Sequence, residues 1–311
     1  MSILIVAGKE DAEARRAAEA LRERKAIFSF LDTAAFPGRT RLSQCEDICR
    51  MGSRELSVPT MVYLRGLACH PLMPGNEKDL AERPRGFLAQ CEEKRSFLES
   101  LLLTFERQGV RFVNSLEANS QHSRKPWQLR LLQDAGLPVP RWTATNDPAA
   151  VRTFARAVGP CVYKPLSGGA TVRLLETRDL SRERLDALKL APVLFQEYYA
   201  GVSVRAYVIG GRVIAAAEIR SEEVDYRRDE REVSPVRLTV AERRAAVTAS
   251  RACGMAFTGV DLIRGKDGFR VLECNPSPMF AVFEQKTGLD IAGPLAELLI
   301  LKAGMGSGSI V

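Results

Sequence analysis

A short apolar strand, a helix and a second strand open the sequence, and this order restricts how the first part of the chain can fold. Residues 3–7 (ILIVA) are continuously apolar, residues 10–24 have helical periodicity, and residues 26–32 (AIFSFLD) return to a strand pattern. Strands joined by a helix pair in parallel, with helices on the faces of the sheet. We therefore expect a doubly wound parallel-sheet domain over residues 1–116, closed by a strand at 111–115.

Composition excludes several classes of function. No window approaches ~18 consecutive apolar residues, so no membrane span is expected, and the amino terminus lacks the basic region of a signal peptide. Seven cysteines without a compact framework suit a reducing cytoplasm, and only two histidines leave little room for histidine chemistry. The net charge of +7 suits a phosphorylated or acidic ligand. Nucleic acid is not an expected partner, because the basic residues form no aromatic-basic platform.

The rest of the chain divides into two further parts and a tail. Residues 117–192 contain two helices and a strand-turn-strand pair around SGGA, and we expect a small central subdomain. Residues 193–304 are mostly strands followed by a last helix, and residues 305–311 read as a flexible tail. The polar stretch 71–86 is expected to be a loop.

Two strands in this last part are joined by Gly210-Gly211, a typical hairpin turn. If the turn has two residues, Arg205 lies opposite Ala216. The two-residue period of a strand then puts Arg205, Glu218 and Arg220 on one face of the sheet.

A second hairpin carries oxygen ligands at its end. In VLECNPSP (271–278), Glu273 and Asn275 point to the same face, and Asp261 lies on the preceding strand. An even loop would send Glu273 to the face opposite Asp261. A three-residue loop, Lys266-Asp267-Gly268, would pair Gly265 with Phe269 and put Asp261 directly across from Glu273. The second arrangement predicts a Mg²⁺ site. Otherwise the two carboxylates are solvated strand residues.

Two lysines suggest what such a cation serves. Lys164 lies inside an apolar strand, and Lys125 opens a helix, where its charge opposes the helix dipole unless it has an anion to bind. Together with the acidic residues they indicate a nucleoside triphosphate site. Cys274 points away from Glu273 by alternation, and we expect a buried core thiol without a chemical role.

These motifs, in this order, resemble the ATP-grasp superfamily and specifically RimK-like carboxylate–amine ligases. The resemblance runs from Asn114 to Leu301. It rests on Lys125 with GLPVP (136–140), VYKP (162–165), FQEYYAGVSVR (195–205), AAAEIRS (215–221), Asp261 and ECNP (273–276). It implies an α/β chain, α+β in its carboxy-terminal part. The amino-terminal doubly wound domain would be followed by a central lid subdomain and a mainly antiparallel carboxy-terminal subdomain.

The resemblance also implies residue roles. Lys125 and Lys164 would bind ATP phosphates, while Arg205 and Arg220 would steady the transferred phosphate. Asp261, Glu273 and Asn275 would bind one or two Mg²⁺ ions, with Mn²⁺ as the alternative cation. The nucleotide contacts would come from the glycine lid and the hinge, namely Gly168, Gly169, Gln196, Glu197, Tyr198, Tyr199 and Ser203. The lid, Ser167 to Ala170, is shorter than is usual in this family, and Ser203 stands where many relatives have an acidic ribose ligand.

Three segments are similar to graspetide (microviridin-type) peptide maturases: TATNDP (143–148), IRSEEVDYR (219–227) and NPSPMFAVFEQKTGLDI (275–291). Tyr226 and Arg227 would then contact the substrate, unless 220–232 is a plain solvated loop. The resemblance implies a cytoplasmic, dimeric enzyme that uses Mg-ATP and an acyl phosphate to join a carboxylate to an amine or hydroxyl, with a precursor peptide as substrate. The alternatives are an amino-acid ligase acting on a small molecule or protein tail, and a nucleotide-binding regulator that has lost catalysis.

Overall fold

The computed structural model describes residues 2–46, 48–167, 171–221 and 232–304. The chain forms two compact units, one comprising Met1–Leu116 with the segment that begins at Ala292, and the other Glu117–Ile291. The fold class is mixed α/β, as predicted, with one parallel sheet in the first unit and antiparallel sheets in the second.

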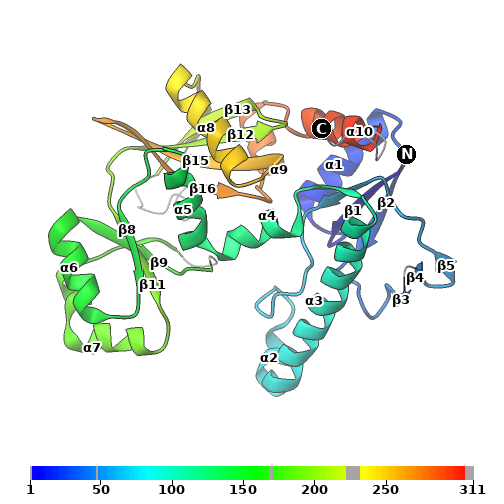
Figure 1. Cartoon of the computed structure of the whole chain (residues 1–311), viewed down its shortest axis with the longest axis horizontal. Coiled ribbons are helices and arrows are strands. Elements are labelled where there is room, and N and C mark those ends of the chain that lie inside the picture. Colours follow the sequence, from blue (N-terminus) through cyan, green and yellow to red (C-terminus); the bar gives the residue numbers. More distant parts are fainter. Residues whose placement is uncertain (1, 47, 168–170, 222–231, 305–311) are drawn as a thin grey trace. The chain divides into compact units, whose positions relative to one another are not determined.

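The first unit is built on a four-stranded parallel sheet of order β2-β1-β6-β7 (Figure 1). Apolar residues on every position of β1 explain its burial on both faces, as expected for a central parallel strand. The predicted β-α-β opening and the closing strand are therefore confirmed. The sheet strands are β1 (Ile3–Ala7), β2 (Phe28–Asp32), β6 (Met61–Leu64) and β7 (Arg111–Val113), and the helices are α1 (Ala12–Glu23), α2 (Glu77–Glu82), α3 (Pro84–Arg107) and α10 (Ala292–Gly304).

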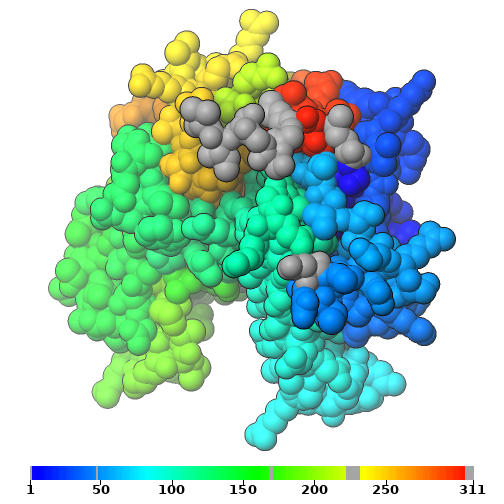
Figure 2. Space-filling view, turned by 45° about the vertical axis from the view of Figure 1, so that its right-hand side comes forward, coloured from blue at the N-terminus to red at the C-terminus, as the bar shows by residue number. Residues whose placement is uncertain are grey.

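Two features of this unit differ from the sequence expectation or go beyond it. Stretch 71–86 is not only loop, because it contains α2 and the first residues of α3, which Pro84 opens. Most side chains of α2 and of the first half of α3 are exposed, and Figure 2 shows them as the cyan surface. A small antiparallel meander of β3 (Leu42–Cys45), β4 (Ile48–Met51) and β5 (Arg54–Glu55) was not predicted. The last helix, α10, packs against α1 and β6.

The second unit contains two sheets. The smaller has order β10-β9-β11-β8, and α6 and α7 cover the face that bears Tyr163 and Phe195 (Figure 1). Its strands are β8 (Trp142–Thr145), β9 (Cys161–Lys164), β10 (Arg173–Leu174) and β11 (Val193–Glu197), and its helices are α6 (Pro148–Val158), η2 (Thr177–Leu180), α7 (Arg182–Asp186) and η3 (Ala187–Lys189). The expected antiparallel pair around the SGGA segment is β9 with β10.

The larger sheet is a five-stranded antiparallel sheet of order β14-β13-β12-β15-β16. Helix α8 packs its alanines against one face, which bears Val204, Leu262 and Cys274. The opposite face, called the site face below, bears Arg205, Asp261 and Glu273 because side chains alternate along each strand. The strands are β12 (Val202–Ile209), β13 (Arg212–Arg220), β14 (Glu232–Pro235), β15 (Phe257–Gly265) and β16 (Gly268–Asn275). The helices of the unit around it are α4 (Leu116–Ser120), η1 (Gln121–Ser123), α5 (Lys125–Asp134), α8 (Val240–Ala252) and α9 (Ala281–Thr287).

Candidate active site

The β15–β16 hairpin brings the predicted metal ligands together by a route that differs from the prediction. The turn has two residues, not three, because Gly265 pairs with Gly268. Further along, Leu262 pairs with Val271 and Asp261 pairs with Glu273, which leaves Leu272 as the extra residue of a β-bulge. The bulge reverses the facing that the even turn would impose. Asp261 therefore does lie directly across from Glu273.

Asn275 completes this group of oxygen-bearing side chains. Its Nδ2 donates a hydrogen bond to Asp261 Oδ2 at 3.0 Å. Asp261 is 7% exposed, while Glu273 and Asn275 are half-buried. Two carboxylates and an amide at one strand end are a donor set that suits Mg²⁺. No cluster of three His, Cys, Asp or Glu residues able to hold a metal occurs in the part of the chain that the structure describes. The candidate metal site thus depends on the amide of Asn275.

Arg205 binds one of these carboxylates with both arms of its guanidinium. Its Nε donates to Asp261 Oδ1 and its Nη2 to Asp261 Oδ2, each at 2.7 Å. β12 is adjacent to β15, and Arg205 lies directly opposite Asp261 in this pairing. A fork-to-fork pair of this kind fixes orientation as well as charge.

The expected grouping of Arg205 with Arg220 is wrong. The two-residue turn at Gly210-Gly211 is confirmed, since Ile209 pairs with Arg212. An irregularity between Tyr207 and Val208 then shifts the register by one residue, so that Arg205 lies opposite Ala217 rather than Ala216. By alternation, Glu218 and Arg220 project from the face opposite Arg205. Arg220 has a 67% exposed side chain and lies 3.8 Å from Glu232.

Both predicted phosphate-binding lysines converge on Glu273. Lys125 Nζ lies 2.7 Å from Glu273 Oε2, and Lys164 Nζ lies 3.8 Å from the same oxygen, although the lysines come from α5 and β9. Both lysine side chains are 11% exposed. Burial alone would raise the pKa of Glu273, but Lys164 and Lys125 outweigh it and hold the pKa well below its usual range. Glu273 is therefore the anion between two cations.

The hinge between β11 and β12 offers unused polar groups beside this cluster. Gln196 is 3% exposed, and it shares a face of its sheet with Lys164 because Leu194, two residues before it, pairs with Lys164. Gln196 Nε2 and the Tyr199 hydroxyl are buried and have no hydrogen-bond partner among the described residues. Buried polar atoms are rarely left unpaired, so these two groups fit the binding of a polar ligand such as a nucleotide.

The remaining hinge residues have other contacts. Glu197 forms an ion pair with Arg141 at 3.2 Å, and the hydrogen bond from Arg141 is the main cause that lowers the pKa of Glu197. Tyr198 is exposed and Ser203 is half-buried. The Arg270 guanidinium lies 4.5 Å from the centre of the Tyr199 ring, a cation–π contact that ties the hinge to β16. Arg141 and Arg270 were missed by sequence reasoning, which has no pattern for such pairs.

Four predicted site residues lie outside the described residues. They are Gly168 and Gly169 of the lid, and Tyr226 and Arg227 of the expected substrate loop.

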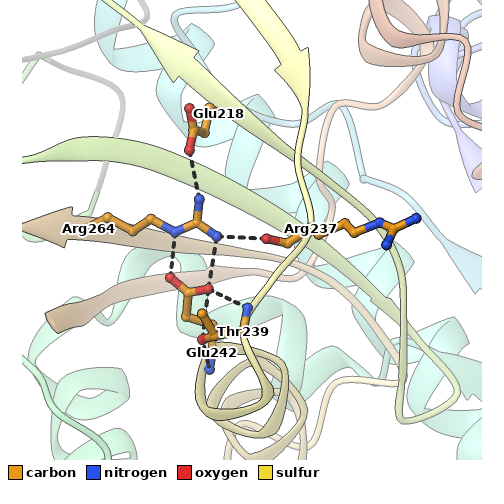
Figure 3. A network of polar contacts seen from close by, with 5 residues as sticks. All are labelled: Glu218, Arg237, Thr239, Glu242 and Arg264. Carbon is orange, nitrogen blue, oxygen red and sulfur yellow. Dashed lines mark hydrogen bonds and ion pairs between the residues drawn. The ribbon is translucent and has the colours of Figure 1, made fainter.

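Sequence reasoning also missed a polar network on the face of the large sheet opposite the site face, the face that α8 covers (Figure 3). Arg264 donates from Nε to Glu242 Oε1 at 2.5 Å, from Nη2 to Glu242 Oε2 at 2.8 Å and from Nη1 to Glu218 Oε1 at 2.7 Å. Glu242 also completes a capping box with Thr239 at the start of α8. The network fixes α8 against two strands, β13 and β15, and β15 is the strand that carries Asp261. Only the T-x-x-E spacing of the capping box was readable in the sequence.

Cys274 behaves as predicted. It is 2% exposed and belongs to the core cluster beneath the large sheet. A hydrogen bond with Cys253 and burial both raise the pKa of the Cys274 thiol well above its usual value.

Among the described residues, no helix combines the length and the apolar character that a membrane span requires.

Solved structures that resemble this chain define its class. PsnB, described as an ATP-grasp ligase and solved with a phosphomimetic variant of a minimal precursor, Mg and ADP, is 38% identical, with a TM-score of 0.88 over 97% of this chain and 98% of PsnB. The macrocyclase MdnC from Microcystis aeruginosa MRC, solved with its precursor peptide MdnA, is 20% identical with a TM-score of 0.80 over 97% of this chain and 100% of MdnC, and it supports the fold alone. The fold is that of the ATP-grasp ligases.

The family follows from a match over more than half of the chain. The model of the RimK-like ATP-grasp domain matches residues 123–299, so the chain belongs to the RimK-like ATP-grasp family. A relative from Teredinibacter turnerae, described as a probable alpha-L-glutamate ligase, is 35% identical over 212 residues, which are 64% of this chain and 70% of the relative. The resemblance inferred from the motifs is confirmed.

Proposed function

We propose that this protein uses Mg-ATP to activate a carboxylate of a precursor peptide and joins it to an amine or a hydroxyl. The observation that carries the proposal is the convergence of Lys125, Lys164 and Arg205 on the carboxylates of Glu273 and Asp261. Three cations and two carboxylates, held mostly out of water, provide positive charge for phosphates and oxygen ligands for a divalent cation in one place.

Each residue has a role in this proposal. Lys125 and Lys164 bind the phosphates, and Asp261, Glu273 and Asn275 hold Mg²⁺, which supplies positive charge against the phosphate oxygens. Arg205 orients Asp261 and neutralises charge on the transferred phosphoryl group. The Gln196 amide and the backbone of Tyr198 and Tyr199 hold the adenine. The role of Arg220 depends on the family resemblance alone, because its strand register does not support it.

The reaction needs positioning and charge neutralisation rather than a histidine base. A carboxylate oxygen of the peptide attacks the terminal phosphorus of ATP, the bond to the ADP oxygen breaks, and an acyl phosphate forms. An amine or hydroxyl of the same peptide then attacks the acyl carbon and phosphate leaves. The net product is an amide or ester, ADP and phosphate, and the peptide has lost one water per bond.

The extent of the similarities favours a peptide over a small substrate. The likeness to PsnB covers nearly the whole chain, whereas the match to the probable alpha-L-glutamate ligase covers 64% of it. The second candidate, addition of glutamate to an acceptor, is supported by the 35% identity of that relative. The role of the Gly168-Gly169 lid, the substrate contacts of Tyr226 and Arg227, the subdomain boundary at 192, the homodimer and the cytoplasmic location stay predictions.

Mass spectrometry distinguishes the two candidates. The protein is incubated with Mg-ATP and the peptide encoded beside its gene, and separately with glutamate and the same peptide. Loss of water from the peptide, with matching ADP release, supports the proposal, whereas a mass gain of one glutamate residue supports the second candidate. Glu273→Ala is the inactive control, and Asp134→Ala is its matched control, since Asp134 is exposed and forms an ion pair with Arg130 one turn away on α5. If neither incubation forms ADP, both candidate functions are contradicted.

A further inference from the structure

One buried amide holds the segment that carries two proposed metal ligands. β16 is an edge strand of the large sheet, so among the described residues no strand lies along one side of its backbone. Gln128 of α5 takes that place at Cys274. Its Oε1 accepts a hydrogen bond from the Cys274 N–H at 2.9 Å, and its Nε2 donates to the Cys274 carbonyl at 2.8 Å. Gln128 is 3% exposed, so water does not compete for these bonds.

These two bonds fix the peptide units on both sides of Cys274. The N–H belongs to the peptide that joins Glu273 to Cys274, and the carbonyl belongs to the peptide that joins Cys274 to Asn275. Orienting both planes sets the direction in which Glu273 and Asn275 leave the strand. The constraint acts directly after the Leu272 bulge, where the regular ladder is interrupted.

Gln128 also connects this segment to a phosphate-binding lysine. Lys125 and Gln128 are three residues apart on α5 and therefore project from neighbouring positions of the helix. Lys125 reaches Glu273 at 2.7 Å, so α5 contacts two successive residues of β16 through two side chains. The two hydrogen bonds of the Gln128 amide thereby fix the distance between Lys125 on α5 and the carboxylate of Glu273 on β16.

We propose that Gln128 is a positioning residue that sets the spacing between Lys125 and the metal ligands Glu273 and Asn275. This inference rests on the proposed function of that site. Groups that orient metal ligands typically change metal affinity by about 10- to 100-fold when they are removed, and loss of Gln128 should act in this range.

The test measures metal binding in addition to activity. Mn²⁺ replaces Mg²⁺ as the probe, and its binding to the full chain in the presence of ADP is followed by electron paramagnetic resonance. Gln128→Met keeps the shape of the side chain and removes both hydrogen bonds. Gln121→Met is the matched control, because Gln121 is 5% exposed and donates to the Cys253 carbonyl at 2.9 Å, at the end of α8 rather than in β16.

We expect Gln128→Met to raise the dissociation constant for Mn²⁺ at least about tenfold, with Gln121→Met within about twofold of the wild type. Equal shifts in both variants, or no shift in Gln128→Met, would overturn the positioning role while leaving the proposed function intact. If Gln128→Met does not fold, Gln128→Asn is measured by the same criteria, because its shorter amide cannot reach both backbone atoms. A wild-type chain that binds no Mn²⁺ with ADP would overturn the proposed function itself.

Discussion

Asp261 lies directly opposite Glu273 although the turn between their strands has an even number of residues. The Leu272 bulge makes the two carboxylates face each other, and Arg205 and the two lysines provide the opposite charge. Without these cations the facing carboxylates would repel each other. Both the activity and the stability of the protein should therefore depend on this balance of charge.

Replacing Glu273 by Gln should have two separable effects. ADP formation should be abolished, because a proposed metal ligand loses its charge. Without any nucleotide, the free energy of unfolding should also fall by about 2 kcal/mol, since Lys125 and Lys164 lose their shared anion. Urea denaturation of the ligand-free protein measures the second effect.

Asp134→Asn provides the matched control for this stability change. Asp134 also pairs with a cation, Arg130, but on the exposed surface of α5. Exposed pairs contribute little, so this variant should differ from the wild type by less than about 0.5 kcal/mol. Equal losses in the two variants would argue against a special role for the lysine–Glu273 cluster.

Arg205 and Arg220 should differ strongly in their contribution to turnover. Arg205→Met removes the bidentate partner of Asp261, whereas Arg220→Met removes an exposed side chain on the opposite face. We expect turnover to fall at least about 100-fold in the first variant and much less in the second. Initial rates of ADP release measure both. Comparable losses of turnover in the two variants would show that Arg220 has the catalytic role that the family resemblance implies, although the strand register places it on the opposite face.

The comparison of these arginines shows what the sequence could and could not predict. Alternation and hairpin signals correctly predicted β12, β13, β15 and β16 and the Gly210-Gly211 turn. They could not predict the bulges at Tyr207–Val208 and Leu272, because a bulge depends on packing across the sheet and leaves no local pattern. For Arg205 the bulge broke the predicted grouping. For Glu273 the bulge compensated for an incorrect turn length.

Long-range side-chain contacts were the other part that sequence reasoning could not reach. Gln128 binds a residue 146 positions away, and Arg264 joins β15 to α8 and β13. Such partners are set by the tertiary fold, since neither glutamine nor arginine at these positions breaks a local pattern. The lysines were predictable because each is anomalous where it stands, in an apolar strand or at a helix start.

Gly201→Ala should destabilise the hinge. A Cβ at Gly201 would lie 1.8 Å from the Arg264 carbonyl oxygen, and backbone cannot move aside as a flexible side chain can. We expect a loss of about 1–3 kcal/mol in the free energy of unfolding, together with a raised KM for ATP. Gly86→Ala in α3 is the contrasting change, because a Cβ there meets nothing within 4 Å, and it should stabilise the protein by about 0.5–1 kcal/mol. Denaturant melts and KM values measure both, and an unaffected Gly201→Ala would contradict the close contact.

Cysteine labelling should separate the exposed thiol from the buried ones. Cys45 is exposed, whereas the other six cysteines are buried. Burial raises the pKa of the Cys69 thiol to about 11, which keeps it protonated and unreactive at neutral pH. Iodoacetamide should therefore modify Cys45 rapidly in the native protein and Cys274 only after unfolding. Peptide mapping identifies the labelled residues, and rapid native labelling of Cys274 would revive a chemical role for it.

The contribution of Glu273 to stability should depend on pH in a defined direction. The lysines hold the folded-state pKa of Glu273 below the value of about 4.3 expected in the unfolded chain. The stabilisation is therefore fully present above that unfolded value and is lost as the pH falls through the acid range. Because the side chain introduced by Glu273→Gln carries no charge at any pH, the difference in free energy of unfolding between the wild type and this variant should be largest above about pH 5.5 and should shrink toward about pH 3. Urea melts of both proteins across this range measure the difference, and a difference that stays constant or grows on acidification would show that the ion pairs with Lys125 and Lys164 do not stabilise the fold.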